Sequence, residues 1–311
     1  MITVELDIFS GNPNPRWTLS DKEANDLLDR VMADRSLASP PKHVGGLGYR
    51  GFIVRADDPR WNRVKLPSKF YVSANSILTE RALLNSAGAE RAVKDEVRQA
   101  AQDSIESTDR GWSQLWSDYM AGRAARPTKQ AGTGPVIGSP KPDIPEDTPP
   151  QVGDDNFSTA ACGSLAVTSD TNFTFWNGDT NSLWNNNCYN FASNYKSYTF
   201  AQPGRKANVQ WSILDCGNYS GAIGFASAYD GHTNACWSGW QYLTCFVIWP
   251  GNDYHWYRLC ANGHWCHKPG STPARNYDNS GNWITDPYYC NRGNYTVFCS
   301  YRYFPHGWSV S

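Results

Sequence analysis

The stretch "NNNCYN" places Cys188 directly after three asparagines, which are residues that favour the N-cap position of a helix. A cysteine in the first turn of a helix meets unpaired backbone N–H groups and the positive end of the helix dipole. Both favour the thiolate, which is the nucleophilic form of the side chain. The local sequence therefore marks Cys188 as a candidate nucleophile.

The number of cysteines also indicates a free thiol. All nine lie between residues 151 and 311, and an odd number cannot pair completely. Eight lie in strand-like or loop contexts where a disulfide is expected: Cys162, Cys216, Cys236, Cys245, Cys260, Cys266, Cys290 and Cys299. We therefore predict that Cys188 is unpaired. The alternative is that Cys188 belongs to a disulfide and another cysteine is free.

A cysteine nucleophile needs a histidine that accepts its proton, and this histidine needs a partner that orients its ring. His43 and His306 are weak candidates, and His232 is expected at the surface beyond a predicted helix at 218–229. The best candidates lie in an expected antiparallel meander. Its strands are predicted at 243–249, 254–260 and 264–268, with turns at "PGND" and "ANG".

The register across the "ANG" turn decides which side chains of this meander meet. A two-residue loop places His255 and His267 on opposite faces, whereas a three-residue loop ending in a bulged Gly263 places them on one face. The second register also makes Cys260 and Cys266 neighbours on the other face. We therefore predict the three-residue loop and a Cys260–Cys266 disulfide. His255 would be the general base and His267 would orient it; alternatively, both rings simply pack.

The order Cys188, His255, His267 resembles the papain-like superfamily, and within it the NlpC/P60 cysteine peptidases. Those proteins carry a cysteine at the start of a helix packed on an antiparallel sheet, a histidine on a following strand, and a polar residue about a dozen residues later. The resemblance covers about 185–300, with "NCYN" where the family has Asp-Cys-Ser-Gly. It implies hydrolysis of a peptide or cell-wall-type (peptidoglycan-like) amide substrate without a cofactor.

Further side chains complete the expected site. The backbone N–H of residue 188, with the amides of Asn187 or Asn186, is expected to stabilise the oxyanion. Gln202, in the turn 199–205, is expected to line the cleft. Two further carboxylates are alternative orienting groups: Asp278 and Asp286. No metal is expected, because "CANGHWCH" lacks a CxxC pair and a second pair of ligands.

Composition divides the chain into two halves. Residues 1–150 hold 20 of the 28 Lys and Arg, whereas residues 151–311 hold ten of the 14 Trp and no Glu. Between them, residues 126–155 contain seven prolines and four glycines. We predict an α+β domain over 1–122, a Pro/Gly-rich linker over 123–155, and a disulfide-rich papain-like α+β domain with an antiparallel sheet over 156–311.

The N-terminal domain shows no recognisable site, so a targeting, inhibitory or partner-binding role is the hypothesis, which rests on its separateness. Its strands are predicted at 3–9, 49–56 and 69–74. Helices are predicted at about 21–35, 76–87 and 89–107, the first opened by Ser20 and Glu23 in capping-box spacing.

The net charge of −1 indicates no nucleic-acid or anionic-membrane partner, and the longest apolar run, "LTCFVIW", is too short to span a membrane. The cysteines predict an extracellular or otherwise oxidising compartment. The start "MITVELDIFSG" does not resemble a classical signal peptide. A secreted carbohydrate-binding, adhesive or self-assembling structural protein without catalysis is the alternative to the hydrolase.

Overall fold

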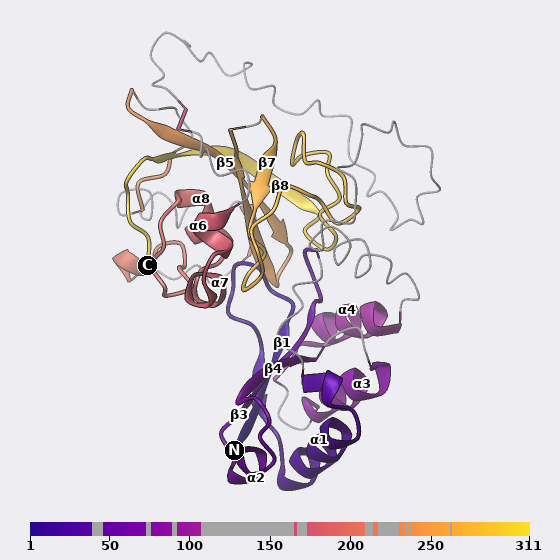
Figure 1. Cartoon of the computed structure of the whole chain (residues 1–311). Helices are drawn as coiled ribbons and strands as arrows, with labels where there is room; N and C mark the ends of the chain where they lie inside the picture. Colours follow the sequence, from indigo (N-terminus) through magenta and orange to yellow (C-terminus); the bar gives the residue numbers. More distant parts are fainter. Residues whose placement is uncertain are drawn as a thin grey trace.

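The computed structural model describes residues 1–38, 46–72, 76–88, 92–106, 165–166, 173–208, 214–216, 230–233, 236, 238–261 and 263–311. These residues form two lobes, each built on a four-stranded antiparallel sheet (Figure 1). We call the described residues up to Glu106 the N-terminal unit and those from Leu165 the C-terminal unit. The predicted α+β class is confirmed. The linker at 123–155 and the helix at 218–229 lie outside the described residues.

The sheet of the N-terminal unit has the order β2-β1-β3-β4. Its bounds are β1 Ile2–Asp7, β2 Arg16–Thr18, β3 Gly51–Ala56 and β4 Lys69–Val72. Alternate residues such as Val4, Val54 and Phe70 are buried in one cluster with residues of the helices. The predicted strands are confirmed with shorter bounds, whereas β2 was not predicted.

Helices pack beside this sheet (Figure 1). They are α1 Asp21–Ala33, α2 Pro59–Arg63, α3 Ile77–Ser86 and α4 Asp95–Glu106, with the 3₁₀ helix η1 Arg35–Ala38. The capping box of α1 is confirmed, since the Ser20 side chain accepts from the backbone of Glu23 and the Glu23 side chain accepts from the backbone of Ser20.

The sheet of the C-terminal unit has the order β7-β6-β5-β8. Its bounds are β5 Gln241–Trp249, β6 Asp253–Leu259, β7 Trp265–His267 and β8 Val297–Pro305. Short helices lie beside it: α6 Thr174–Asn177, α7 Thr180–Asn185, α8 Cys188–Ser193 and the 3₁₀ helix η3 Arg205–Ala207. Strand β8 was not predicted, although it is the long neighbour of β5.

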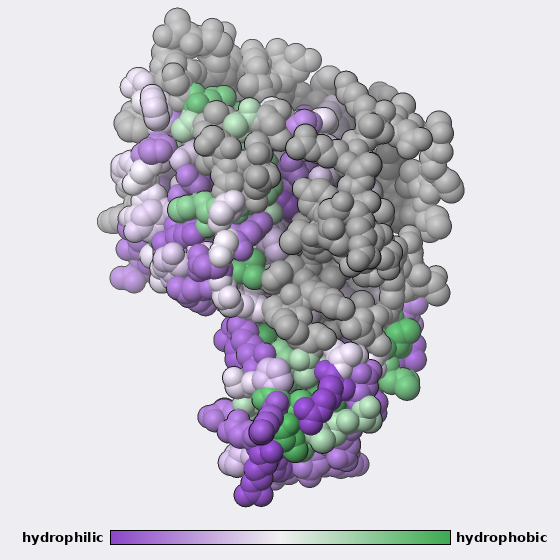
Figure 2. All heavy atoms as spheres, in the orientation of Figure 1, coloured by the Kyte–Doolittle hydropathy of each residue, from purple (hydrophilic) through white to green (hydrophobic). Residues whose placement is uncertain are grey.

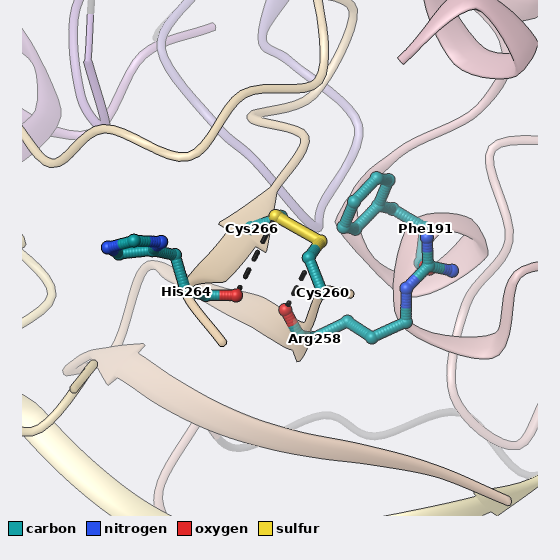
Figure 3. Close-up of a disulfide and its surroundings, with 5 residues drawn as sticks. All are labelled: Phe191, Arg258, Cys260, His264 and Cys266. Atoms are coloured by element: carbon teal, nitrogen blue, oxygen red, sulfur yellow. Dashed lines mark hydrogen bonds between the residues drawn. A yellow bond between two sulfur atoms is a disulfide. The ribbon is translucent and has the colours of Figure 1, made fainter. Parts of the chain in front are cut away.

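The predicted register of the second hairpin is confirmed. Tyr257 pairs with His267 and Arg258 pairs with Cys266, and Gly263 in the turn has a φ of 77°. The predicted Cys260–Cys266 disulfide is present, with its Cα atoms 6.1 Å apart (Figure 3). Arg258 on the same strand donates to the carbonyl of Phe191, which ties β6 to α8.

The remaining cysteines follow the prediction only in part. Cys188 is free and buried, as predicted, but Cys245 and Cys290 are also free, so the prediction that they pair is wrong. Cys245 faces Tyr257 on β6, and the Tyr257 hydroxyl is the atom that Cys290 Sγ contacts at 3.9 Å.

A second disulfide joins Cys216 to Cys299, and Cys236 is also disulfide-bonded. Cys162 lies outside the described residues. The disulfides fit an oxidising compartment.

The two units share one buried apolar cluster. It contains Leu6 and Phe9 of the N-terminal unit together with Trp249 and Tyr295 of the C-terminal unit. The rings of Phe9 and Trp249 meet edge to face at 6.0 Å. The chain after β1 therefore reaches the base of the C-terminal sheet (Figure 1).

The described surface is mainly hydrophilic with scattered apolar residues in the view of Figure 2. Within the described ranges, no helix has both the length and the hydropathy needed to cross a membrane.

Candidate functional site

Cys188 is the first residue of α8, as predicted. Asn187 is the N-cap, and its side chain accepts from the backbone N–H groups of Tyr189 and Asn190. Asn190 closes a capping box by accepting from the backbone of Asn187. The cap uses the backbone N–H groups of Tyr189 and Asn190, whereas the oxyanion prediction relied on the backbone N–H of Cys188.

The environment of the thiol favours its neutral form. The side chain is fully buried, and its Sγ contacts the carbonyl oxygen of Tyr254 at 4.0 Å. Burial raises the pKa of Cys188 well above its usual range, and the nearby charge of Asp253 raises it further. The expected lowering of the pKa by the helix terminus is thus outweighed by desolvation.

His255 and His267 lie together, as the register predicts. His255 Nε2 and His267 Nδ1 are 2.8 Å apart, and His267 Nε2 lies 2.8 Å from the carbonyl oxygen of Tyr277. Burial lowers the pKa of both imidazoles, so each ring is neutral and carries one proton. A carbonyl only accepts, so His267 Nε2–H donates to Tyr277, and His255 Nε2–H donates to His267 Nδ1.

This assignment leaves His255 Nδ1 as an acceptor. Its hydrogen-bond partner is the hydroxyl of Ser10, which comes from the N-terminal unit. The Ser10 hydroxyl also contacts the thiol of Cys188. A residue that the sequence did not single out therefore lies between the expected nucleophile and the expected base.

Ser10 belongs to a loop, Ile8–Asn14, that we call the Ser10 loop. The Asn14 side chain accepts from the backbone N–H groups of Ile8 and Phe9, at 3.0 and 2.8 Å. Arg50 donates to the carbonyls of Ile8 and Phe9 and forms a buried ion pair of 2.6 Å with Asp7. Groups of the N-terminal unit thus fix the shape of this loop.

Asp253, at the start of β6, binds the Ser10 loop. Its carboxylate accepts from the backbone N–H groups of Ser10, Gly11 and Asn12, the last at 2.7 Å. The hydroxyl of Tyr295 donates to the same carboxylate. Burial raises the pKa of Asp253 to about 6, and these hydrogen bonds oppose that rise.

Two predicted oxyanion or substrate residues converge on one carbonyl, that of Gly11. Asn187 Nδ2 and Gln202 Nε2 donate to it at 2.8 and 2.7 Å, and the hydroxyl of Tyr254 lies 3.3 Å away. A Cβ at Gly11 would lie 2.3 Å from the Tyr254 ring, so only glycine permits this approach. The chain itself occupies the place expected for a substrate.

Asn186 does not join this group. Its Nδ2 donates to the carbonyl of Ser182 and its Oδ1 accepts from the backbone of Tyr198. Its own carbonyl accepts from Lys268 Nζ, a fully buried amine whose pKa burial lowers to about 7.

The alternative orienting carboxylates are also used elsewhere. Asp278 accepts from the backbone of Ser280, Asn282 and Asn291. The group that accepts from His267 is the carbonyl of the preceding residue, Tyr277. A second set of hydrogen bonds occupies Asp286, which accepts from the backbone of Tyr288 and the hydroxyl of Tyr301.

The expectation for His232 is wrong, because its side chain is fully buried and its Nδ1 accepts from Arg302 Nε at 3.0 Å. Among the described residues, no three His, Cys, Asp or Glu side chains are grouped so as to hold a metal ion. Sequence reasoning missed Ser10, Gly11, Asp253 and Lys268. "SGNPNP" indicated only a turn, and no local signal marks its contact with a strand more than 240 residues later.

Comparison with known proteins gives one relevant relative. The chain is 46% identical over 115 residues to insoluble matrix shell protein 1 of Ruditapes philippinarum. The match covers 75% of that protein and 36% of this chain. No family model matches the chain, and no solved structure matches it. The resemblance to NlpC/P60 peptidases is untested by these comparisons and stays a prediction.

The predicted function as a cysteine peptidase or amidase is wrong. The relative is named as an insoluble matrix protein of shell, and this name favours the structural alternative over catalysis. The geometry agrees with this correction, because the thiol of Cys188 is buried and neutral and the Gly11 carbonyl already engages Asn187 and Gln202.

Proposed function

Because the chain belongs to the family of insoluble matrix shell protein 1, we propose that it is a non-catalytic structural component of a secreted, insoluble matrix. The identity of 46% across three quarters of that relative is the observation that carries this proposal. The chain also extends well beyond the match, so the remaining 64% of its length adds parts that the match does not describe.

The buried polar side chains of the candidate site support a structural role. Buried polar groups such as Asp253, His255 and Lys268 are hydrogen-bonded within the chain. A buried network of such hydrogen bonds makes one packing arrangement specific, whereas an active site keeps groups open for a substrate. The network therefore suits a rigid building unit.

The disulfides support an extracellular location. Cys260–Cys266 and Cys216–Cys299 both lie in the C-terminal unit, and such bonds persist where thiols are not kept reduced. A secreted matrix is one such environment.

Antibodies raised against the chain would test the proposal in the tissue that produces it. We expect the protein in extracellular material, and we expect it to remain in the insoluble residue after washing with salt and detergent. Recovery of the protein mainly in a soluble fraction from inside cells would contradict the proposal.

A further inference from the structure

We propose that the N-terminal unit of one chain docks on the C-terminal unit of a second copy, through the same contacts that the Ser10 loop makes within one chain. The docking face consists of Asn187, Gln202, Asn252, Asp253, Tyr254 and His255. This inference deepens the proposed function by naming a second copy of the chain as the partner. It rests on that function in one respect, because a matrix supplies the high protein concentration that favours docking between copies.

The Ser10 loop is built like a ligand in a binding site. Its backbone N–H groups point to the Asp253 carboxylate, its Gly11 carbonyl accepts from Asn187 and Gln202, and Asn12 Nδ2 donates to the carbonyl of Asn252 at 3.0 Å. These bonds join residues at least 176 positions apart. None of them depends on the chain that connects the two units.

The loop is also preorganised for docking. Arg50 and Asn14 fix it from within the N-terminal unit, so little additional ordering is needed when it meets a docking face. Phe9 supplies an apolar anchor next to the polar contacts, because its ring packs on Trp249.

The length of chain between the units permits exchange between copies. Fifty-eight residues separate Glu106 from Leu165, and they include the stretch 126–155 with seven prolines. A connection of 58 residues can span at most about 190 Å, which is enough to reach a neighbouring molecule. Docking of each N-terminal unit on the next chain is a head-to-tail contact, which builds rings or open chains.

Docking within one chain competes with this exchange. Because both units are tethered, the internal contact has an effective concentration that is commonly in the millimolar range. Exchange is therefore expected when proteins are concentrated, as in a matrix, and docking within one chain is expected in dilute solution.

Two complementary full-length variants remove this competition. Gly11→Val disables the loop, since a Cβ at this position meets the Tyr254 ring at 2.3 Å, and leaves the docking face intact. Asp253→Ala disables the docking face and leaves the loop intact. Each variant alone is expected to be monomeric. Their mixture is expected to form a 1:1 complex of twice the monomer mass, measured by size-exclusion chromatography with light scattering.

Controls separate docking from general loosening of the fold. The double variant Gly11→Val/Asp253→Ala mixed with Gly11→Val is expected to stay monomeric, because no functional loop is present. Asp230→Asn removes another buried carboxylate, one that contacts Tyr189 and Gly204 within the C-terminal unit. It should not complex with Gly11→Val, because its own loop remains docked. If the folded variants fail to combine, the proposal is overturned.

A second measurement uses the wild-type chain, in case a variant does not fold. Unlabelled and ¹⁵N-labelled proteins are mixed at high concentration, diluted, and cleaved briefly with trypsin, which can cut after Lys129 in the proline-rich stretch. Native mass spectrometry should find N-terminal units of one label bound to C-terminal units of the other. If every pair carries a single label, the proposed exchange between copies is overturned. This result does not depend on the tissue experiment that tests the structural role.

Discussion

The two ends of strand β6 are held by different means. At its C-terminal end, Cys260 is joined covalently to Cys266, six positions along the chain. At its N-terminal end, Asp253 binds the backbone of Ser10, 243 positions away, by hydrogen bonding alone. One end is fixed by a local bond and the other by a remote contact.

The difference shows how the two units depend on each other. A disulfide that closes a short loop removes little entropy from the unfolded chain, so it stabilises mainly its own hairpin. The contact at Asp253 joins two units with separate sheets and a shared apolar cluster. Loss of this remote contact should therefore affect the whole molecule, whereas loss of the local bond should affect one edge.

Removal of the remote contact should have the largest effect. We expect Asp253→Ala to lower the free energy of unfolding at pH 7 by about 3–5 kcal/mol, because the buried N–H groups of Ser10, Gly11 and Asn12 lose their acceptor. Urea unfolding measures this change. The exposed Asp21 serves as a control, and Asp21→Asn should change the free energy by less than about 0.5 kcal/mol. Equal effects of Asp253→Ala and Asp21→Asn would contradict the role of Asp253 as the acceptor that holds the Ser10 loop.

The free energy of unfolding should also depend on pH through Asp253, at the N-terminal end of β6. Burial raises the pKa of Asp253 from 3.8 to about 6, so the folded protein binds a proton more tightly than the unfolded chain in this range. The proton on Asp253 therefore adds about 3 kcal/mol to the free energy of unfolding below pH 4, at 1.4 kcal/mol per pKa unit, and this addition is lost as the pH rises through 6. The ionised carboxylate that remains at pH 7 still accepts the hydrogen bonds of the Ser10 loop.

The facing hydroxyl of Tyr295 does not titrate in this window, since burial raises its pKa. The measurement compares urea unfolding from pH 4 to 7 for the wild type and Asp253→Asn. Identical pH profiles for the two proteins would sink this prediction.

Removal of the local bond should have a smaller effect. The double substitution Cys260→Ser/Cys266→Ser opens a loop with a sequence separation of six, which corresponds to about 2 kcal/mol in the free energy of unfolding. The N-terminal unit should remain docked, so unfolding should stay a single transition by fluorescence and circular dichroism. Two separate transitions would show that the hairpin also holds the remote contact.

Cys188 contacts Tyr254 of β6, and we expect its thiol to react least with an alkylating reagent. Because burial raises its pKa and its Sγ contacts the carbonyl of Tyr254, iodoacetamide near neutral pH should not label it measurably in the folded protein. The same reagent should label it rapidly in the unfolded chain, which serves as the control. Peptide mass mapping reads the result, and rapid labelling of folded Cys188 would show an activated thiol.

Sequence reasoning succeeded where contacts are close along the chain. The capping box of α1 follows from two residues three positions apart, and the N-cap of α8 follows from the asparagines directly before Cys188. The hairpin register followed from one turn and from two pairs of residues, Cys260–Cys266 and His255–His267, that had to be compatible with it.

The candidate site was predicted only in part, because its partners come from distant segments. Asn187 was expected to stabilise an oxyanion and Gln202 to line a cleft, whereas both side chains donate to the carbonyl of Gly11 in the other unit. Cys245 was expected in a disulfide, yet it faces Tyr257 across the sheet. A disulfide forms only if the two cysteines lie close together in space. That distance depends on how remote segments pack and cannot be read from the sequence.

The sequence by itself determined the α+β class, the hairpin with its disulfide, and the capped position of Cys188, because each depends on backbone preferences within a few residues. Only the tertiary structure decided the state of that thiol and the identity of its neighbours. Desolvation and the proximity of Asp253 raise its pKa, and the Ser10 loop fills the site. These effects arise from burial and remote contacts, which exist only after the two units have packed together.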